Sequence, residues 1–285
     1  MVESIKELRQ ICQEPVKQWQ DLSGKVYGAR FSIYFTKLFL ELGWEPSVVT
    51  ILMACIGVCG ALLLIFQGIL PVIGFLLLIL HYILDCSDGE VARYGKKQNI
   101  QWTLYDYLIH YLVKSKTFLC LGLGAHLRGQ GAWIFIFSVS AVLFITMEKV
   151  LRELYYIIYC KKVRGFVGSV SEEQLIFLQE KKKDSPDGSR MEEGTASPLR
   201  STLSFLRIAL VNFEMYMFLF LLGACIDLLI PGGDLPGLGL NVKEILLMAY
   251  GVILPLHFID LLYSYIKRDG LTADICRLAK KLERD

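Results

Sequence analysis

The chain lacks the cysteine and histidine patterns of zinc and redox proteins. Its eight cysteines are scattered, and none stands in a Cys-x-x-Cys pair or beside a histidine at zinc-binding spacing. We therefore expect reduced, structural thiols at these positions. The first thirty residues contain no apolar run, so a cleavable signal peptide is not expected either. No internal repeat stands out.

What the chain does contain is apolar sequence. Hydrophobic residues make up 54% of its 285 positions and the mean hydropathy is +0.47, too apolar for an ordinary soluble domain. Apolar stretches near the roughly 20 residues needed to cross a bilayer recur along it. They predict six membrane spans, at residues 48–67, 69–85, 104–126, 132–151, 209–230 and 242–265. The predicted fold is all-α, a polytopic bundle of six transmembrane helices.

Basic residues gather in segments that alternate with the predicted spans. These segments are 1–43, 93–97, 161–207 and 267–285. On the opposite side only Arg128 and Lys243 are found. The positive-inside rule therefore predicts that both termini, and the link after the second span, are cytoplasmic.

The same segments give the expected domain organisation. Residues 1–43 form a cytoplasmic amino-terminal segment, and residues 44–266 form the membrane domain. Within that domain, 161–207 is expected to be a cytoplasmic insertion, partly disordered because its centre is rich in charged and small polar residues. Residues 267–285 are a cytoplasmic tail.

An amphipathic pattern precedes the first predicted span. The apolar residues that share one helical face are Phe31, Tyr34, Phe35, Leu38, Phe39 and Leu42, while Ser32, Lys37 and Glu41 face away. This pattern predicts a helix lying in the membrane interface. The alternative is an ordinary amphipathic helix that packs on protein.

Acidic residues stand at the end of the second predicted span. Ionised side chains at membrane depth are costly unless they face a cavity, a metal or an opposite charge. If this span continues as a helix through Arg93, then Asp85, Asp88, Gly89 and Ala92 share one face. Two carboxylates at i and i+3 can bind a hard divalent cation together. The small residues beside them allow a bulky ligand to approach the helix, and Arg93 flanks the stripe within reach of phosphate oxygens.

The third predicted span opens with a second polar stripe, formed by Asp106, His110 and Lys114 at helical spacing. Facing helices would supply Asp85 and Asp88 from one side, and Asp106 and His110 from the other. Such a cluster suits a two-metal site, which neutralises and orients a diphosphate. The alternative is a set of helix-end charges that snorkel into headgroups, although snorkelling favours Lys and Arg over Asp. Lys114 either neutralises a substrate phosphate or pairs with an Asp of the site.

This stretch resembles the signature of the CDP-alcohol phosphotransferases, integral membrane enzymes with the pattern Asp-x2-Asp-Gly-x2-Ala-Arg-x8-Gly-x3-Asp-x3-Asp. The matching residues are Asp85, Asp88, Gly89, Ala92, Arg93 and Asp106. The six-span layout and the preceding interfacial helix are similar to the family as well, so the likeness covers most of residues 31–265. Thr50 stands in a Pro-Ser-x-x-Thr stretch that resembles the Pro-Asn-x-x-Thr opening of the family's first span.

The resemblance implies an enzyme of phospholipid biosynthesis. It would transfer a phosphoalcohol group from a CDP-linked donor, such as CDP-diacylglycerol, to an acceptor hydroxyl and release CMP. By this likeness Asp85, Asp88 and Asp106 would bind divalent metal, Mg²⁺ or Mn²⁺, and Gly89, Ala92 and Arg93 would line the nucleotide site. It also implies a homodimer whose site lies in a cytoplasmic cavity open toward lipid. Nothing in the sequence indicates a nucleic-acid partner.

Two positions depart from the family pattern. Trp102 replaces the second glycine and places a large side chain near the mouth of the site. His110 replaces the last Asp, which is proposed to assist deprotonation of the acceptor. An imidazole titrates close to neutral pH and so suits a general base, which makes His110 the predicted catalytic residue. The other readings are a metal ligand that favours Mn²⁺ over Mg²⁺, a structural hydrogen-bonding residue, and loss of activity.

Two other classes of function stay open. The first is a catalytically silent relative of the family that acts as a membrane scaffold, which the residues Trp102 and His110 motivate. The second is a transporter with Asp106, His110 and Lys114 as a polar pathway. The transporter is disfavoured because the acidic residues crowd one membrane boundary and not the midplane. The acceptor alcohol, and whether the donor is a lipid or soluble, cannot be read from the motif.

Overall fold

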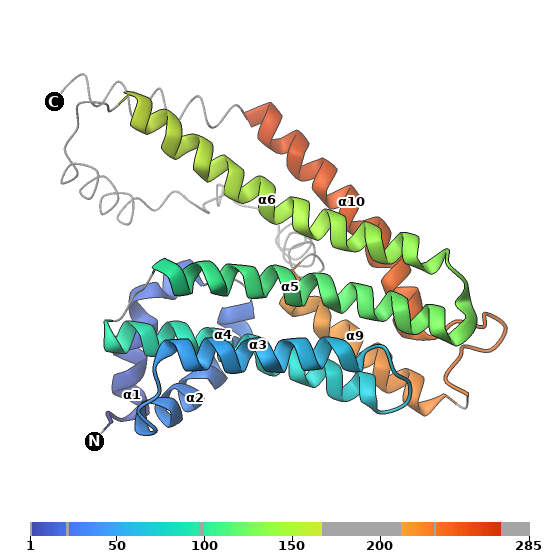
Figure 1. Cartoon of the computed structure of the whole chain (residues 1–285), viewed down its shortest axis with the longest axis horizontal. Helices are drawn as coiled ribbons and strands as arrows, with labels where there is room; N and C mark the ends of the chain where they lie inside the picture. The colour runs from blue at the N-terminus through green and yellow to red at the C-terminus, as the bar shows by residue number, and fades with distance from the viewer. Residues whose placement is uncertain (1, 21–22, 97–99, 167–211, 231, 269–285) are drawn as a thin grey trace, which may run out of the picture. The chain divides into compact units, whose positions relative to one another are not determined.

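A computed structural model describes residues 2–20, 23–96, 100–166, 212–230 and 232–268 (Figure 1). The regular structure among these residues is helical, with no strand, which confirms the predicted all-α class. The chain divides into two compact units. One is formed by Met1–Thr146 and Ile208–His257, and the other by Met147–Arg207 and Phe258–Asp285. The predicted segments 1–43, 44–266 and 267–285 stay a prediction.

Residues 2–20 form a string of short helical turns. From here on, the name amino-terminal segment refers to these residues alone. The segment begins with α1 (Ile5–Leu8), whose start is a capping box in which Ser4 and Glu7 bond each other's backbone N–H. The turns that follow are a π-helical turn at Arg9–Gln13 and a 3₁₀ helix at Glu14–Trp19. A further π-helical turn, Gly24–Gly28, leads into α2 (Ala29–Glu41).

α3 (Pro46–Leu63) and α4 (Leu70–Gly95) form a hairpin and lie where the first two spans were predicted. The two helices approach closely at Gly60 and Gly74. A Cβ on Gly60 would lie 2.9 Å from the Gly74 carbonyl oxygen, and one on Gly74 would lie 2.7 Å from the Gly60 oxygen. Contacts between such small residues let membrane helices pack backbone to backbone.

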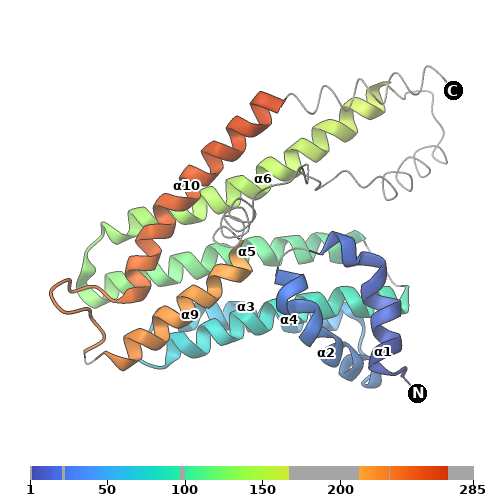
Figure 2. The same ribbon diagram turned by 180° about the vertical axis from the view of Figure 1, so that it is seen from behind.

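α4 continues well beyond the predicted end of the second span at residue 85. It runs to Gly95 and closes with Lys96 in the left-handed conformation, at φ 51°. The condition for placing the acidic residues on one helical face, a helix through Arg93, is therefore met. In the first unit α4 packs against α2, α3 and the later helix α9 (Phe213–Leu229) (Figure 2).

The remaining described helices are α5 (Ile100–Ala125), α6 (Ile134–Phe166) and α10 (Val242–Arg268), with a π-helical turn at His126–Gln130 after α5. α5 packs against α3. The predicted insertion 161–207 begins within α6. Its residues after 166 lie outside the described residues, as do residues 269–285 of the tail.

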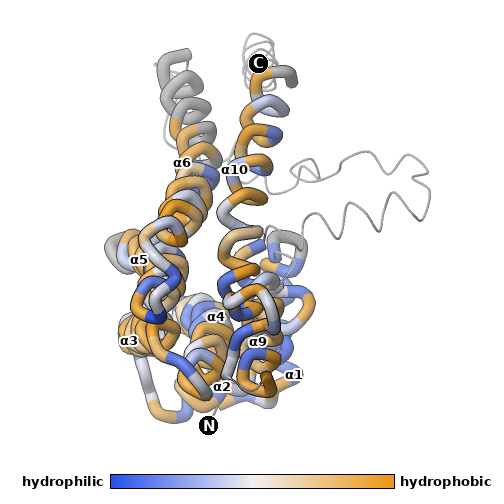
Figure 3. Tube along the Cα trace, turned by 90° about the vertical axis from the view of Figure 1, so that its right-hand side faces the viewer, coloured by the Kyte–Doolittle hydropathy of each residue, from blue (hydrophilic) through white to orange (hydrophobic). Residues whose placement is uncertain are grey.

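In the part of the chain that the structure describes, four helices are long and apolar enough to cross a membrane: Pro46–Leu63, Leu70–Gly95, Ile134–Leu151 and Val242–Ile266. The apolar stretches of α6 and α10 are visible in Figure 3. The other two predicted spans fall on α5, which carries several charged residues, and on α9, which has 17 residues. Four apolar helices indicate a membrane-embedded protein, and the count of six stays a prediction.

The faces of α2 are divided as an interfacial helix requires. Phe31, Tyr34, Leu38 and Leu42 are exposed, whereas the polar residues Ser32 and Thr36 are fully buried. The helix therefore turns its polar side toward α4 and its apolar side outward. Phe39 departs from the predicted apolar face, because it is buried and stacks on Trp44 with 5.1 Å between ring centroids.

α10 contains an internal proline, Pro255, which has no backbone N–H. The carbonyl of Gly251, four residues earlier, therefore has no donor within the helix. Ser140 of α6 donates to that oxygen at 2.7 Å. A Cβ on Gly251 would lie 2.8 Å from the backbone of Phe137, so only glycine permits this approach of α6 and α10.

Charged residues between α5 and α10 form a compact network of ion pairs. Arg128 donates two hydrogen bonds to Glu244, at 3.0 and 2.6 Å, and one to Asp234 at 2.7 Å. Lys243 pairs with Asp227 at 2.9 Å. Burial favours the neutral form of Arg128, but the two carboxylates outweigh it and raise its pKa. The network thus joins the loop after α5 to the start of α10.

Candidate metal centre

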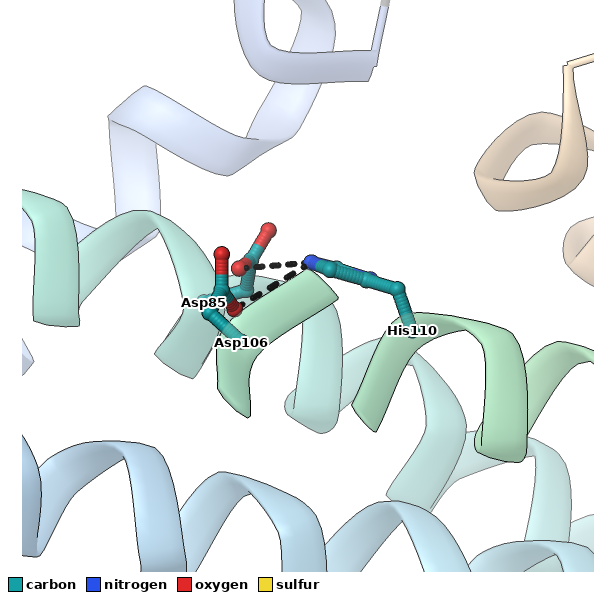
Figure 4. A group of neighbouring side chains, drawn as sticks. All are labelled: Asp85, Asp106 and His110. Carbon is teal, nitrogen blue, oxygen red and sulfur yellow. Dashed lines mark hydrogen bonds and ion pairs between the residues drawn. The ribbon is translucent and has the colours of Figure 1, made fainter. Parts of the chain in front are cut away.

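Two helices of the first unit meet at the predicted site. α4 carries Asp85, and α5 carries Asp106 and His110 one helical turn apart. Figure 4 shows both carboxylates directed at the imidazole. His110 Nε2 lies 3.0 Å from Asp85 Oδ1 and 3.5 Å from Asp106 Oδ1. The imidazole thus bridges the two carboxylates and donates its Nε2 proton to Asp85.

Asp85, Asp106 and His110, referred to below as the acidic cluster, have the geometry of a metal site. One ligand atom from each side chain lies within 4.8 Å of the other two. The side chains are mostly buried, with exposed fractions of 20%, 30% and 16% in that order. Two carboxylate oxygens and one imidazole nitrogen suit Mn²⁺ or Zn²⁺ better than Mg²⁺, which prefers oxygen alone. The residues present therefore fit a divalent cation, whose binding would release the Nε2 proton.

Asp88 adjoins the acidic cluster but is not one of its three members. Its Oδ2 accepts a hydrogen bond from Thr50 Oγ1 of α3 at 2.8 Å. Thr50 is buried, with 3% exposed, and also lies 3.0 Å from the carbonyl oxygen of Pro46. The threonine that the family resemblance pointed to thus orients one of the predicted metal ligands.

Arg93 lies against the predicted nucleotide face of α4. Its Nη1 is 3.1 Å from the position that a Cβ on Gly89 would take. Its Nε donates to the backbone carbonyl of Cys12 at 2.7 Å. A methyl group at position 89 would therefore crowd the guanidinium where it lies on the helix. Ala92, on the same face, is partly buried.

A small pocket lies beside the acidic cluster. His110 lines it together with the ion pair of Lys114 and Glu214, whose Nζ and Oε1 are 2.9 Å apart. Aromatic rings complete the lining, among them Phe213, whose centroid is 5.0 Å from the Lys114 ammonium. The pocket offers one positive charge, one negative charge and an apolar wall next to the imidazole.

Two further residues contribute to this region, and sequence reasoning missed the first. Glu214 pairs with Lys114, and its signal was a lone acidic residue in the first turn of an apolar predicted span. His81 packs edge-on against His110, with 5.9 Å between ring centroids, while its Nδ1 lies 2.9 Å from the Met53 carbonyl oxygen. The side chain of Trp102 lies outside the described residues.

No family model matches the chain, and no curated protein matches it either. The likeness to the CDP-alcohol phosphotransferases therefore depends on the signature residues and their spacing. The convergence of Asp85, Asp106 and His110 in the structure is an observation separate from the sequence pattern. A sequence pattern does not by itself require side chains of two helices to meet.

Proposed function

We propose that this protein is a membrane CDP-alcohol phosphotransferase of phospholipid biosynthesis. It would move a phosphoalcohol group, in the first instance phosphatidyl, from a CDP-linked donor to an acceptor hydroxyl and release CMP. The observation that carries the proposal is the acidic cluster, in which α4 and α5 bring Asp85, Asp106 and His110 together beside Asp88. The signature spacing and this convergence support the same chemistry.

The residues divide the work of the proposed reaction between them. Divalent metal held by Asp85, Asp88 and Asp106 would supply charge neutralisation of the diphosphate. Arg93 binds a phosphate oxygen of the donor through its guanidinium. The acceptor oxygen forms a bond to the β-phosphorus, and the bond from that phosphorus to the bridging oxygen breaks. CMP leaves with the bridging oxygen and its electron pair, and the hydroxyl proton passes to His110, which in this reaction acts as the base and not as a metal ligand.

The membrane setting is part of the same proposal. α5 and α9 join the four apolar helices to make six spans, with both termini and the acidic cluster on the cytoplasmic side. The distribution of basic residues supports this orientation. The pocket lined by Lys114 and Glu214 adjoins His110 and is where the acceptor alcohol would enter. By family likeness the active form is a homodimer.

The test is CMP release by the purified protein. CDP-diacylglycerol is supplied with a panel of alcohols and either Mg²⁺ or Mn²⁺, and CDP-polyols and CDP-aminoalcohols are then tried with lipid acceptors. Metal-dependent release is expected, and Asp88→Asn should reduce it to background. Glu41→Gln is the matched control, because this exposed carboxylate of α2 pairs with Lys37 and lies outside the cluster. Absence of CMP with every donor and acceptor pair contradicts the proposal.

A catalytically silent relative is the second candidate. His110 Nε2 lies 3.0 Å from Asp85 Oδ1 and 3.5 Å from Asp106 Oδ1, so both carboxylates have a partner without any cation, and this observation favours the silent relative. A silent relative would be a folded protein that binds neither Mn²⁺ nor CMP and releases no CMP. Wild-type turnover in a His110→Ala variant would leave the enzyme in place but remove His110 from the mechanism.

A further inference from the structure

Glu90 is a buried carboxylate that the proposed reaction does not use. Only 2% of it is exposed, and it accepts three hydrogen bonds from neutral donors. Ser32 Oγ and Gln13 Nε2 bond its Oε1 at 2.6 and 2.8 Å, and Thr36 Oγ1 bonds its Oε2 at 2.6 Å. A buried carboxylate is tolerated only when such donors satisfy it. The three bonds therefore hold α4, α2 and the amino-terminal segment together at one point.

Gln13 is the member of this group that belongs to the amino-terminal segment. Its Nε2 donates to Glu90 and also lies 2.7 Å from the carbonyl oxygen of Ala29, at the start of α2. The residue before it, Cys12, is fully buried, and its carbonyl oxygen accepts the hydrogen bond from Arg93 Nε. The segment is thus anchored one residue away from the atom that holds the arginine.

We infer that Gln13 and Glu90 are positioning residues for the donor site, because they fix the Cys12 carbonyl that holds Arg93 over Gly89. This inference rests on the proposed function, in which Arg93 binds the nucleotide's phosphate. With Nε bonded to Cys12, the two Nη groups lie 3.1 and 3.6 Å from the Cβ position of Gly89, on the face of α4 that carries Asp85. A guanidinium oriented before the donor arrives loses less conformational entropy on binding. The amino-terminal segment is therefore part of the donor site.

The direct test is Gln13→Met, which keeps the side-chain length and removes the donor. The expected result is a rise of about tenfold in the KM for the CDP-linked donor, with little change in kcat, because about tenfold corresponds to one hydrogen bond to a charged group. The affinity for CMP, measured by calorimetry, should fall by the same factor. Glu14→Gln is the matched control, since this neighbouring side chain is exposed and pairs with Lys17.

A second measurement separates positioning from general destabilisation. In an Arg93→Met background, Gln13→Met should add no further loss of CMP affinity, because the arginine that it positions is gone. A purely structural role would add the same loss in both backgrounds. If Gln13→Met does not fold, Gln13→Asn replaces it, because the shorter amide cannot bond Glu90 and the Ala29 carbonyl together.

The thiol of Cys12 reports on the segment without any substrate. It is buried, and burial raises its pKa to about 11, so it should react slowly with a water-soluble maleimide. Gln13→Met should accelerate labelling of Cys12, mapped by peptide mass spectrometry, and Glu14→Gln should not. Unchanged labelling, together with unchanged donor KM and CMP affinity, overturns the inference. Failure of the wild type to bind or release CMP instead contradicts the proposed function.

Discussion

Thr50 and Asp88 join α3 and α4 beside the acidic cluster through one side-chain hydrogen bond of 2.8 Å. We predict that Thr50→Val, which is nearly the same size, lowers Mn²⁺ affinity about tenfold because it frees a ligand carboxylate to rotate. Titration of the purified protein with Mn²⁺, followed by electron paramagnetic resonance, measures this. Thr50→Ser keeps the hydroxyl and should bind as the wild type does. Equal affinity in the valine variant would exclude Thr50 from the site.

Single residues were predictable where helical spacing carried the information. Asp85, Asp106 and His110 could be placed on facing stripes because the periodicity of a helix is known, and the structure brings them together. Glu214 and Gln13 could not be placed in this way. Each acts through a partner far along the chain, Lys114 or Glu90, and no periodic pattern marks such a pair.

Among the elements, α2 has the clearest consequence for membrane contact. Its exposed apolar residues should lie among lipid chains and headgroups, while Lys37 reaches water. We predict that a spin label at Leu38→Cys, in liposomes, collides more often with oxygen than with a water-soluble nickel complex. A label at the adjacent Lys37→Cys should show the reverse preference. The same preference at both positions would mean that α2 does not lie in the interface.

The network around Arg128 should stabilise the contact between the loop after α5 and α10. Arg128→Met leaves Glu244 buried, with 4% of its side chain exposed, and without its cation. We predict a loss of about 3 to 5 kcal/mol in unfolding free energy, measured by SDS-induced unfolding in mixed micelles.

The double variant Arg128→Met/Glu244→Met is the control for this prediction. It removes the carboxylate as well as the cation, so it should recover part of the loss. A double variant less stable than Arg128→Met alone would show that the unpaired charge is not the cause.

Helices were easier to predict from the sequence than their ends. The hairpin of α3 and α4 followed from two neighbouring apolar stretches, and α2 followed from its amphipathic periodicity. α4 extends ten residues past the predicted end of its span at 85, to Gly95. Hydropathy marks the end of a span where charges begin, but here contacts with α2 and the amino-terminal segment continue the helix through the charged residues.

For the whole molecule, the sides of the membrane on which two positions lie determine the number of spans. If α5 and α9 cross the membrane, Ala132 lies outside and Ser185 lies in the cytoplasm. If only the four apolar helices cross, both positions change sides. We predict that an impermeant maleimide labels Ala132→Cys, and not Ser185→Cys, from the outside of intact cells when all other cysteines are replaced. Labelling of Ser185→Cys alone would contradict the six-span arrangement.

The all-α class of the described residues was predictable because composition alone separates a helical membrane protein from a soluble one. The division into two units was not predicted. It falls within α6 and α10, and a continuous helix gives no sequence signal at a boundary between units. The position of the site at one end of the helices was indicated by charge. Carboxylates at a membrane boundary are costly unless a metal, a cavity or an opposite charge stabilises them.

In α10 a side-chain hydrogen bond from another helix replaces a backbone hydrogen bond, and this has a consequence for how the protein inserts into the membrane. Because of Pro255, the Gly251 oxygen is satisfied by Ser140, which belongs to a helix synthesised about a hundred residues earlier. In lipid an unsatisfied carbonyl costs several kcal/mol. α10 therefore completes its hydrogen bonding only against a helix that leaves the ribosome before it, which makes the insertion of α10 dependent on α6.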